Sequence, residues 1–148
     1  MSKTKYLKSG SISEISIQKA VMQWVRVHPL LRGLVIHFPN EGKRTTHYGK
    51  LLKDMGMRRG VSDLFICMQR HGYAGAWIEL KSKDGVVSQD QEEFLNDMAM
   101  QGYFIRVCYS IKEAINIIEG YCFKEWEDCH PPLEFEKTFK ENFEDILA

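Results

Sequence analysis

The sequence predicts an α/β fold in which a central β-sheet is flanked by helices. Several segments repeat apolar residues at the spacing of a helix, and short apolar runs of strand length lie between them. Glycine and proline residues separate these segments. The resulting order is helix, strand, helix, strand, strand, helix, strand, helix, which is typical of a sheet covered by helices.

The first predicted helix spans residues 14–27. Ser13 is a favourable N-cap, and apolar residues then recur every three or four positions until His28-Pro29 ends the pattern. Residues 1–12 are polar and lack this periodicity, so we expect a flexible N-terminal arm.

A strand and a short helix follow. The apolar run over residues 34–38 is closed by Pro39-Asn40, which indicates a strand and a turn. Residues 46–55 can form a helix that stops at Gly56. Its apolar side would consist of Leu51, Leu52 and Met55.

The middle of the chain predicts two paired strands. Residues 64–67 form a continuous apolar run, suited to a strand buried on both faces. Residues 76–81 form a second run, and residues 69–75 between them contain the glycines of a turn. We expect a hairpin-like pair.

Two capping boxes mark the remaining helices. A Ser-x-x-Gln box begins at Ser88 and opens a helix that stops at Gly102. A Ser-x-x-Glu box begins at Ser110 and opens a helix that continues to Tyr121. Residues 103–109 between them are a strand.

Length and composition favour one intracellular domain. A chain of 148 residues with 44% apolar content supports one continuous core. Its longest apolar runs are far too short to span a bilayer, and the N-terminus has no hydrophobic signal region. We therefore expect a cytoplasmic protein without a membrane partner.

The cysteines predict buried free thiols in a reducing compartment. None forms a CxxC pair, and two lie inside apolar runs. A metal site that includes Cys122, Cys129 and His130 is the alternative, but this spacing matches no common zinc pattern. The four residues are Cys67, Cys108, Cys122 and Cys129.

A net charge of zero conceals a strong asymmetry along the chain. Residues 1–118 carry 17 basic and 11 acidic side chains, whereas residues 119–148 carry 3 and 9. The extension 122–148 is therefore acidic, and the spacing of its phenylalanines predicts a helix. We expect this helix to pack on the domain or on a dimer partner, or to cover the basic surface. The basic part contains a candidate DNA-binding patch, with a solvated helix face as the alternative. Its residues are Lys43, Arg44, Lys50, Lys53, Arg58 and Arg59.

The chemistry-bearing residues are Asp63 and the segment Glu79-Leu80-Lys81. Side chains alternate along a strand, so Glu79 and Lys81 share one face while Leu80 points into the core. If Asp63 lies beside Glu79, the two carboxylates repel each other unless a divalent metal neutralises them. Oxygen ligands suit Mg²⁺ or Mn²⁺, and Lys81 could hold the attacking water. A structural ion pair of Glu79 with Lys81 is the alternative.

The stretch from Asn40 to about Tyr121 resembles the VRR-NUC family, the virus-type replication and repair nucleases of the PD-(D/E)XK superfamily. The helix that contains Glu14 and Gln18 also fits the first helix of the family. The resemblance implies a restriction-endonuclease-like fold with a central mixed β-sheet, over residues 13–121. The matching motifs are Pro39–Gly42, Leu51–Gly56, Gly60–Leu64, Trp77–Lys81, Val87–Gln91 and Gln101–Tyr103.

The resemblance also implies the roles of individual residues. Asp63, Glu79 and the Leu80 carbonyl would bind the catalytic Mg²⁺ or Mn²⁺, and Lys81 would position the attacking water. Glu14 would stand near the metal, and Gln91 would support the centre in addition to its capping role. The family usually has proline before the metal-binding aspartate, where this chain has Ser62. Because proline supplies no ligand, we still expect activity.

Stand-alone members of this family resemble Holliday-junction resolvases and tend to be homodimers, because two sites related by a two-fold axis can cut a symmetric four-way junction. The resemblance thus implies a structure-selective endonuclease for branched DNA, encoded by a phage or mobile element, without an organic cofactor. A flap- or end-directed nuclease and a DNA-binding protein with little activity are the alternatives within this fold. A small interaction domain without metal affinity is the alternative from another class.

Overall fold

The computed structural model describes residues 12–39 and 45–125. These residues form a four-stranded sheet with the order β1-β2-β3-β4. The strands are β1 (Val35–His37), β2 (Leu64–Ile66), β3 (Ala76–Leu80) and β4 (Phe104–Cys108). The helices are α1 (Glu14–Val27), η1 (Leu31–Gly33, a 3₁₀ turn), α2 (Thr46–Asp54), α3 (Gln89–Met100) and α4 (Ile111–Phe123).

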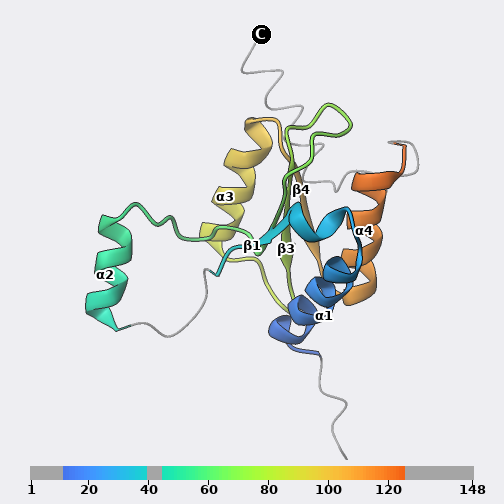
Figure 1. Cartoon of the computed structure of the whole chain (residues 1–148). Coiled ribbons are helices and arrows are strands. Elements are labelled where there is room, and N and C mark those ends of the chain that lie inside the picture. Colours follow the sequence, from blue (N-terminus) through green and yellow to red (C-terminus); the bar gives the residue numbers. More distant parts are fainter. Residues whose placement is uncertain (1–11, 40–44, 126–148) are drawn as a thin grey trace, which may run out of the picture.

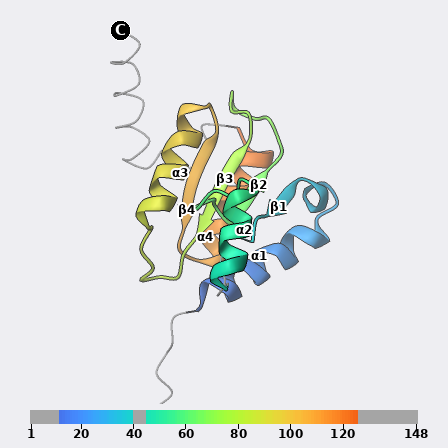
Figure 2. The same cartoon turned by 90° about the vertical axis from the view of Figure 1, so that its left-hand side faces the viewer.

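The sheet is mixed, as expected. β1 pairs antiparallel with β2, and β2 pairs antiparallel with β3, which confirms the predicted hairpin-like pair. β3 and β4 are parallel and are connected through α3. Helices α1 and α4 cover one face of the sheet and α3 covers the other (Figures 1 and 2). The order of helices and strands agrees with the prediction, apart from the short turn η1.

The main core lies between the sheet and the pair α1–α4. Ile17, Val21 and Val25 of α1 are buried, at the helical spacing that predicted them. They pack in one cluster with the inward side chains of the strands, among them Ile78 and Leu80. Leu80 therefore points into the core, as its strand position predicted.

A second, aromatic cluster lies on the face of the sheet that α3 covers. The rings of Phe65 and Trp77, from neighbouring strands, have centroids 4.5 Å apart. Trp77 also meets Phe94 of α3 edge to face at 4.9 Å. Because side chains alternate along β3, Glu79 lies on this same face.

The helix caps follow the predicted residues, with one difference. The Ser13 hydroxyl accepts from Ser16 N, and Ser88 with Gln91 forms a complete capping box. Ser110 accepts from Glu113 N, but the Glu113 carboxylate accepts from Tyr109 N rather than from the capping residue. The second box is thus only half of the predicted arrangement.

Helix α2 forms where it was predicted, but its apolar side is not buried. None of its residues is buried. Leu51 is exposed, and so is Met55, the residue that follows the helix. Figure 1 shows α2 standing away from the sheet. Apolar periodicity predicted the position of this helix correctly. It does not show whether another element covers the apolar side of the helix.

The cysteines differ from the expectation at one position. Cys108 and Cys122 are free and buried, but Cys67, the residue after β2, is exposed. Burial raises the pKa of both buried thiols to about 12. Cys122 belongs to α4 and to the core, so the last helix runs beyond the expected domain boundary.

Some expectations concern residues outside the described ranges. They include nearly all of the N-terminal arm, the acidic extension beyond residue 125, and Cys129 with His130. Within residues 12–39 and 45–125, no helix has the length and apolar content of a membrane span.

Candidate active site

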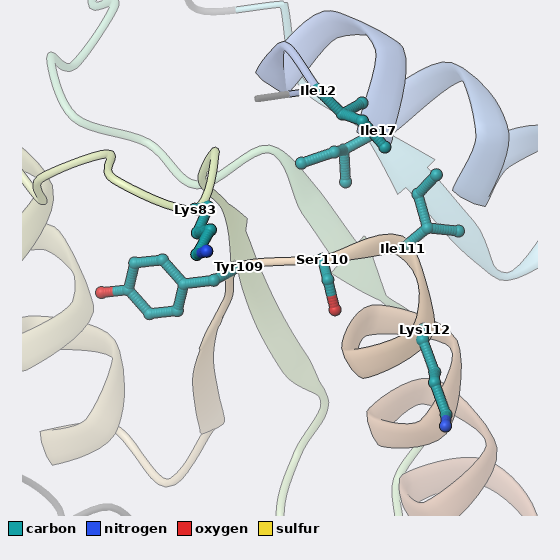
Figure 3. Close-up of a pocket in the computed structure, with 7 residues that line it drawn as sticks. All are labelled: Ile12, Ile17, Lys83, Tyr109, Ser110, Ile111 and Lys112. Atoms are coloured by element: carbon teal, nitrogen blue, oxygen red, sulfur yellow. The ribbon is translucent and has the colours of Figure 1, made fainter. Parts of the chain in front are cut away.

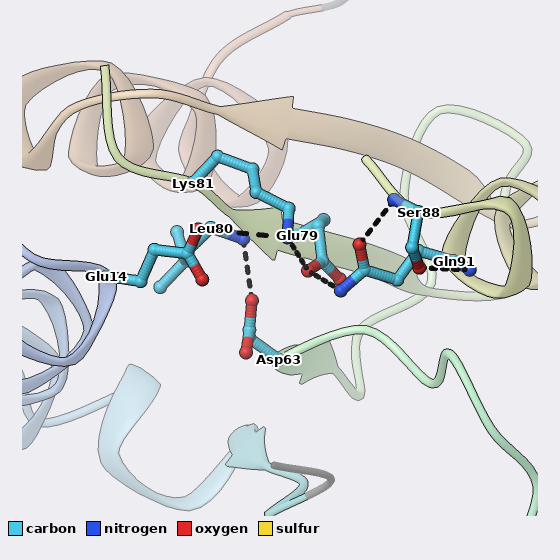
Figure 4. Close-up of polar contacts among 7 residues, drawn as sticks. All are labelled: Glu14, Asp63, Glu79, Leu80, Lys81, Ser88 and Gln91. Carbon is cyan, nitrogen blue, oxygen red and sulfur yellow. Dashed lines mark hydrogen bonds and ion pairs between the residues drawn. The ribbon is translucent and has the colours of Figure 1, made fainter. Parts of the chain in front are cut away.

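The pairing of β2 with β3 places Asp63 next to Glu79. In the register Leu64 lies opposite Ile78, so one further step along both strands sets Asp63 opposite Glu79. Side chains of directly opposite residues project from the same face, with Cβ atoms about 5 Å apart. The Asp63 carboxylate accepts a hydrogen bond of 2.7 Å from the Leu80 backbone N–H (Figure 4). This bond fixes Asp63 against the strand that carries Glu79.

The main chain of Asp63 is held from the opposite side by β1. Its carbonyl oxygen lies 2.8 Å from His37 Nδ1 and accepts a bond of 2.9 Å from Phe38 N. Sequence reasoning missed His37, which belongs to no motif. Its place at the end of a predicted strand was the available signal, but nothing in the sequence pairs that strand with the residue before β2.

Glu79 is buried, with 1% of its surface exposed. Its Oε1 accepts a hydrogen bond of 2.8 Å from Gln91 Nε2. The Gln91 carbonyl oxygen accepts a bond of 2.9 Å from Ser88 N, which completes the capping box. One side chain therefore closes the N-terminus of α3 and supports the buried carboxylate, so the two interpretations of Gln91 are geometrically compatible.

Lys81 lies between two carboxylates. Its Nζ is 3.7 Å from Glu79 Oε1 and 3.8 Å from Glu14 Oε1, and the residue is only 6% exposed. Glu14 is the first residue of α1, so the helix start brings a second acid to the end of β3. These charges keep a buried ammonium group compensated. The structure thus gathers Glu14, Asp63, Glu79, Lys81 and Gln91 into one cluster (Figure 4).

The turn after β3 closes over Glu14. Gly85 N donates to Ser82 O at 2.9 Å, and a Cβ at Gly85 would lie 3.0 Å from Glu14 Oε1. A larger residue at position 85 would press on the acid that contacts Lys81. The glycine therefore permits the close approach of this turn to α1.

The described members of the expected DNA-binding set differ in their surroundings. Lys53 and Arg59 are exposed, and Lys50 pairs with Asp54 on the surface of α2 at 3.6 Å. Arg58 donates to Asp97 of α3 at 2.6 Å, and its guanidinium group lies over the Phe94 ring. Arg58 thereby ties the segment before Asp63 to α3. Lys43 and Arg44 lie outside the described residues.

The donor set suits a hard divalent cation. Across the described ranges, no group of three or more His, Cys, Asp and Glu side chains is arranged to hold a metal. Mg²⁺ does not require such a group, because it is often bound through one or two carboxylates and keeps several waters. Asp63 and Glu79, on adjacent strands, supply that number of carboxylates, and their oxygen donors fit Mg²⁺ or Mn²⁺.

Comparison with known proteins agrees with this architecture. The family model of the VRR-NUC domain matches residues 12–112. A solved structure described as a VRR_NUC domain protein is similar to this chain, with a TM-score of 0.67 and 26% sequence identity. The similarity covers 76% of this chain and 89% of that chain. No curated protein matches the chain. The expected PD-(D/E)XK-type fold and the resemblance stated from the sequence are confirmed.

Proposed function

Since the chain belongs to the VRR-NUC family of nucleases, we propose that it hydrolyses phosphodiester bonds of DNA with Mg²⁺ or Mn²⁺ at the Asp63–Glu79 pair. The observation that carries this proposal is the register that sets these carboxylates on one face, with Lys81 3.7 Å from Glu79. A purely structural ion pair of Glu79 with Lys81 does not involve Asp63, whose carboxylate lies against the same strand and accepts from Leu80 N. That second carboxylate favours a metal-dependent centre.

Each residue of the cluster has a distinct task in this proposal. Asp63, Glu79 and the Leu80 carbonyl would hold the metal, which would supply Lewis-acid polarisation of a phosphate oxygen and lower the pKa of a bound water. Lys81 donates to the attacking water and offsets the negative charge that develops on the phosphate. The remaining residues, Gln91 and Glu14, act through others: Gln91 orients the Glu79 carboxylate, and Glu14 orients the Lys81 ammonium group.

We further propose that the substrate is branched DNA, such as a four-way junction, and that the protein acts as a homodimer. Two centres related by a two-fold axis can cut two strands of a symmetric junction. In this proposal the exposed Lys50, Lys53 and Arg59 would contact phosphates outside the catalytic cluster. Sedimentation of the purified protein tests the dimer, which a monomer at micromolar concentration would exclude.

The nuclease is tested with a cleavage panel of duplex, single-stranded, flap and four-way-junction DNA, with and without Mn²⁺. We expect metal-dependent cleavage that is fastest on the junction. Asp63→Asn and Lys81→Met, which keep the size of each side chain, should each lower the rate at least about 100-fold. Glu92→Gln and Lys19→Met are matched controls on the exposed surface.

The outcomes separate the parts of the proposal. Circular dichroism must show that each variant remains folded. Undiminished cleavage by folded Asp63→Asn and Lys81→Met would reject the assigned centre. Faster cleavage of flaps or ends would reject the junction preference but retain the nuclease, and binding of junctions without any cleavage would favour the DNA-binding alternative.

A further inference from the structure

A pocket of about 450 Å³ lies beside the catalytic cluster. It is bounded by the start of α1, the turn after β3 and the start of α4 (Figure 3). Ile12, Ile17 and Ile111 form an apolar group on one side, while Lys83 and Tyr109 lie on the other. The volume falls within the range of sites that hold small organic groups, about 300–1,000 Å³.

The pocket shares two of its boundaries with the candidate active site. Lys83 lies two residues after Lys81, on the turn that closes over Glu14. Glu14 itself stands between Ile12 and Ile17 in the sequence, and its carboxylate is 3.8 Å from the Lys81 ammonium group. The pocket and the candidate active site are therefore bordered by the same end of α1 and by the same turn after β3.

The lining combines apolar walls with positive charge. Ile17 is buried and forms part of the apolar wall, while Ile12 and Tyr109 are exposed, Tyr109 at 40%. Lys83 and Lys112 add two cationic side chains, and none of the lining residues is acidic. A phosphate by itself would not use the apolar walls. A flat, weakly polar base attached to a phosphate backbone uses both features.

We propose that this pocket receives one unstacked base of the DNA strand, next to the bond that is cut. Tyr109 provides the stacking surface, and Lys83 and Lys112 contact the phosphates on either side of that base. The inference rests on the proposed nuclease function and specifies its substrate. Unstacking costs least where a base is already unpaired, so the pocket favours branch points over continuous duplex.

The test is a binding cycle that requires no cleavage. Full-length protein is titrated, without divalent metal, against fluorescently labelled branched DNA with an intact base or an abasic residue at one position. If the DNA is cleaved, the abasic residue is placed beside the mapped cleavage site. If it is not cleaved, the abasic residue is moved in turn to each position across the branch. Loss of base–aromatic stacking should weaken binding of intact DNA by Tyr109→Ala about 5- to 150-fold. Tyr109→Phe should bind like the wild type.

The abasic DNA decides the proposal. At the position that enters the pocket, an abasic residue should weaken binding by the wild-type protein about as much as Tyr109→Ala weakens binding of intact DNA. On this abasic DNA, Tyr109→Ala should cause no further loss of affinity. Equal losses by Tyr109→Ala on intact and abasic DNA at every position would overturn the proposal. Tyr109→Leu, which retains side-chain volume without an aromatic face, should lose affinity as Tyr109→Ala does and provides a second measure if the alanine variant unfolds.

The lysines have a separate signature. Lys83→Gln and Lys112→Gln should each lower the slope of log Kd against log salt by about 1, on intact and abasic DNA alike. Lys19→Gln, on the exposed surface of α1, is the matched control and should leave the slope unchanged. An unchanged slope in both lysine variants would remove them from the proposed site. Cleavage that depends on Asp63, combined with no coupling between Tyr109 and the base, would reject the pocket while leaving the nuclease intact.

Discussion

Replacing Gln91 by alanine tests how the buried Glu79 carboxylate is supported. The substitution removes the 2.8 Å hydrogen bond from Gln91 Nε2 to Glu79 Oε1 and the 2.9 Å bond that Ser88 N donates to Gln91. A hydrogen bond to a charged group contributes about 1.5–3 kcal/mol, and a neutral one about 0.5–1.5 kcal/mol. We therefore expect Gln91→Ala to lower the free energy of unfolding by about 2–4 kcal/mol.

Ser88→Ala is the matched comparison. It removes the capping hydroxyl, which accepts from Gln91 N at 3.2 Å, but retains the side-chain bond from Gln91 to Glu79. Loss of an N-cap costs about 1 kcal/mol. Because Gln91→Ala also removes the bond from Ser88 N, a double-mutant cycle with Glu79 is needed to isolate the Glu79 contact.

The assay is urea unfolding at pH 7 without divalent metal, because a metal bound to the folded state adds its own stabilisation. A double-mutant cycle of Gln91→Ala with Glu79→Ala should give a coupling of about 1.5 kcal/mol or more. Equal losses in Gln91→Ala and Ser88→Ala, together with a coupling near zero, would refute the view that Gln91 supports the carboxylate.

Four further predictions concern the surroundings of the site and the core. Gly60 has φ +77°, and a Cβ added at this position would lie 2.2 Å from a carbonyl oxygen of α3. Gly60→Ala should therefore lower the free energy of unfolding by about 2 kcal/mol or more. A thermal midpoint equal to that of the wild type would contradict this close approach. Ser62 is fully buried, and its hydroxyl has no hydrogen-bond partner among the described residues. Ser62→Ala should therefore raise the free energy of unfolding, measured in urea, by about 1 kcal/mol. A lower free energy of unfolding would mean that the hydroxyl makes a hydrogen bond. Cys108 and Cys122, whose pKa values burial raises to about 12, should resist alkylation of the folded protein at pH 8, whereas Cys67 reacts, as mass spectrometry of peptides can show. Because the folded-state pKa of these two thiols lies above that of the unfolded chain, their contribution to stability is full below pH 9 and declines as pH rises toward 12; constant stability over that interval would contradict their burial.

Local sequence features predicted the elements well because each depends on residues that are close along the chain. Ser13 and Ser88 cap the helices that they were predicted to cap, and apolar spacing in α1 matches the buried residues. Alternation along β3 correctly separated Leu80, in the core, from Glu79 on the opposite face. All the residues that carry such a pattern lie within one or two helical turns or within one strand.

Contacts between distant segments were less accessible. His37 contacts the carbonyl of Asp63, and Arg58 pairs with Asp97 of α3. Neither contact has a local pattern, because it depends on how the loops approach the sheet. The exposed side of α2 has the same origin: whether an apolar stripe is covered depends on the packing of the whole chain.

By itself, the sequence determined the order of helices and strands and the buried side of α1, and it singled out Asp63, Glu79 and Lys81 as a candidate site. The tertiary structure alone decided that Lys81 lies between Glu14 and Glu79, and that three separate segments enclose a pocket beside them. The physical reason is that periodicity and capping act through neighbours in the chain. Distances between side chains of different elements, by contrast, are set by strand register and by the packing of helices on the sheet.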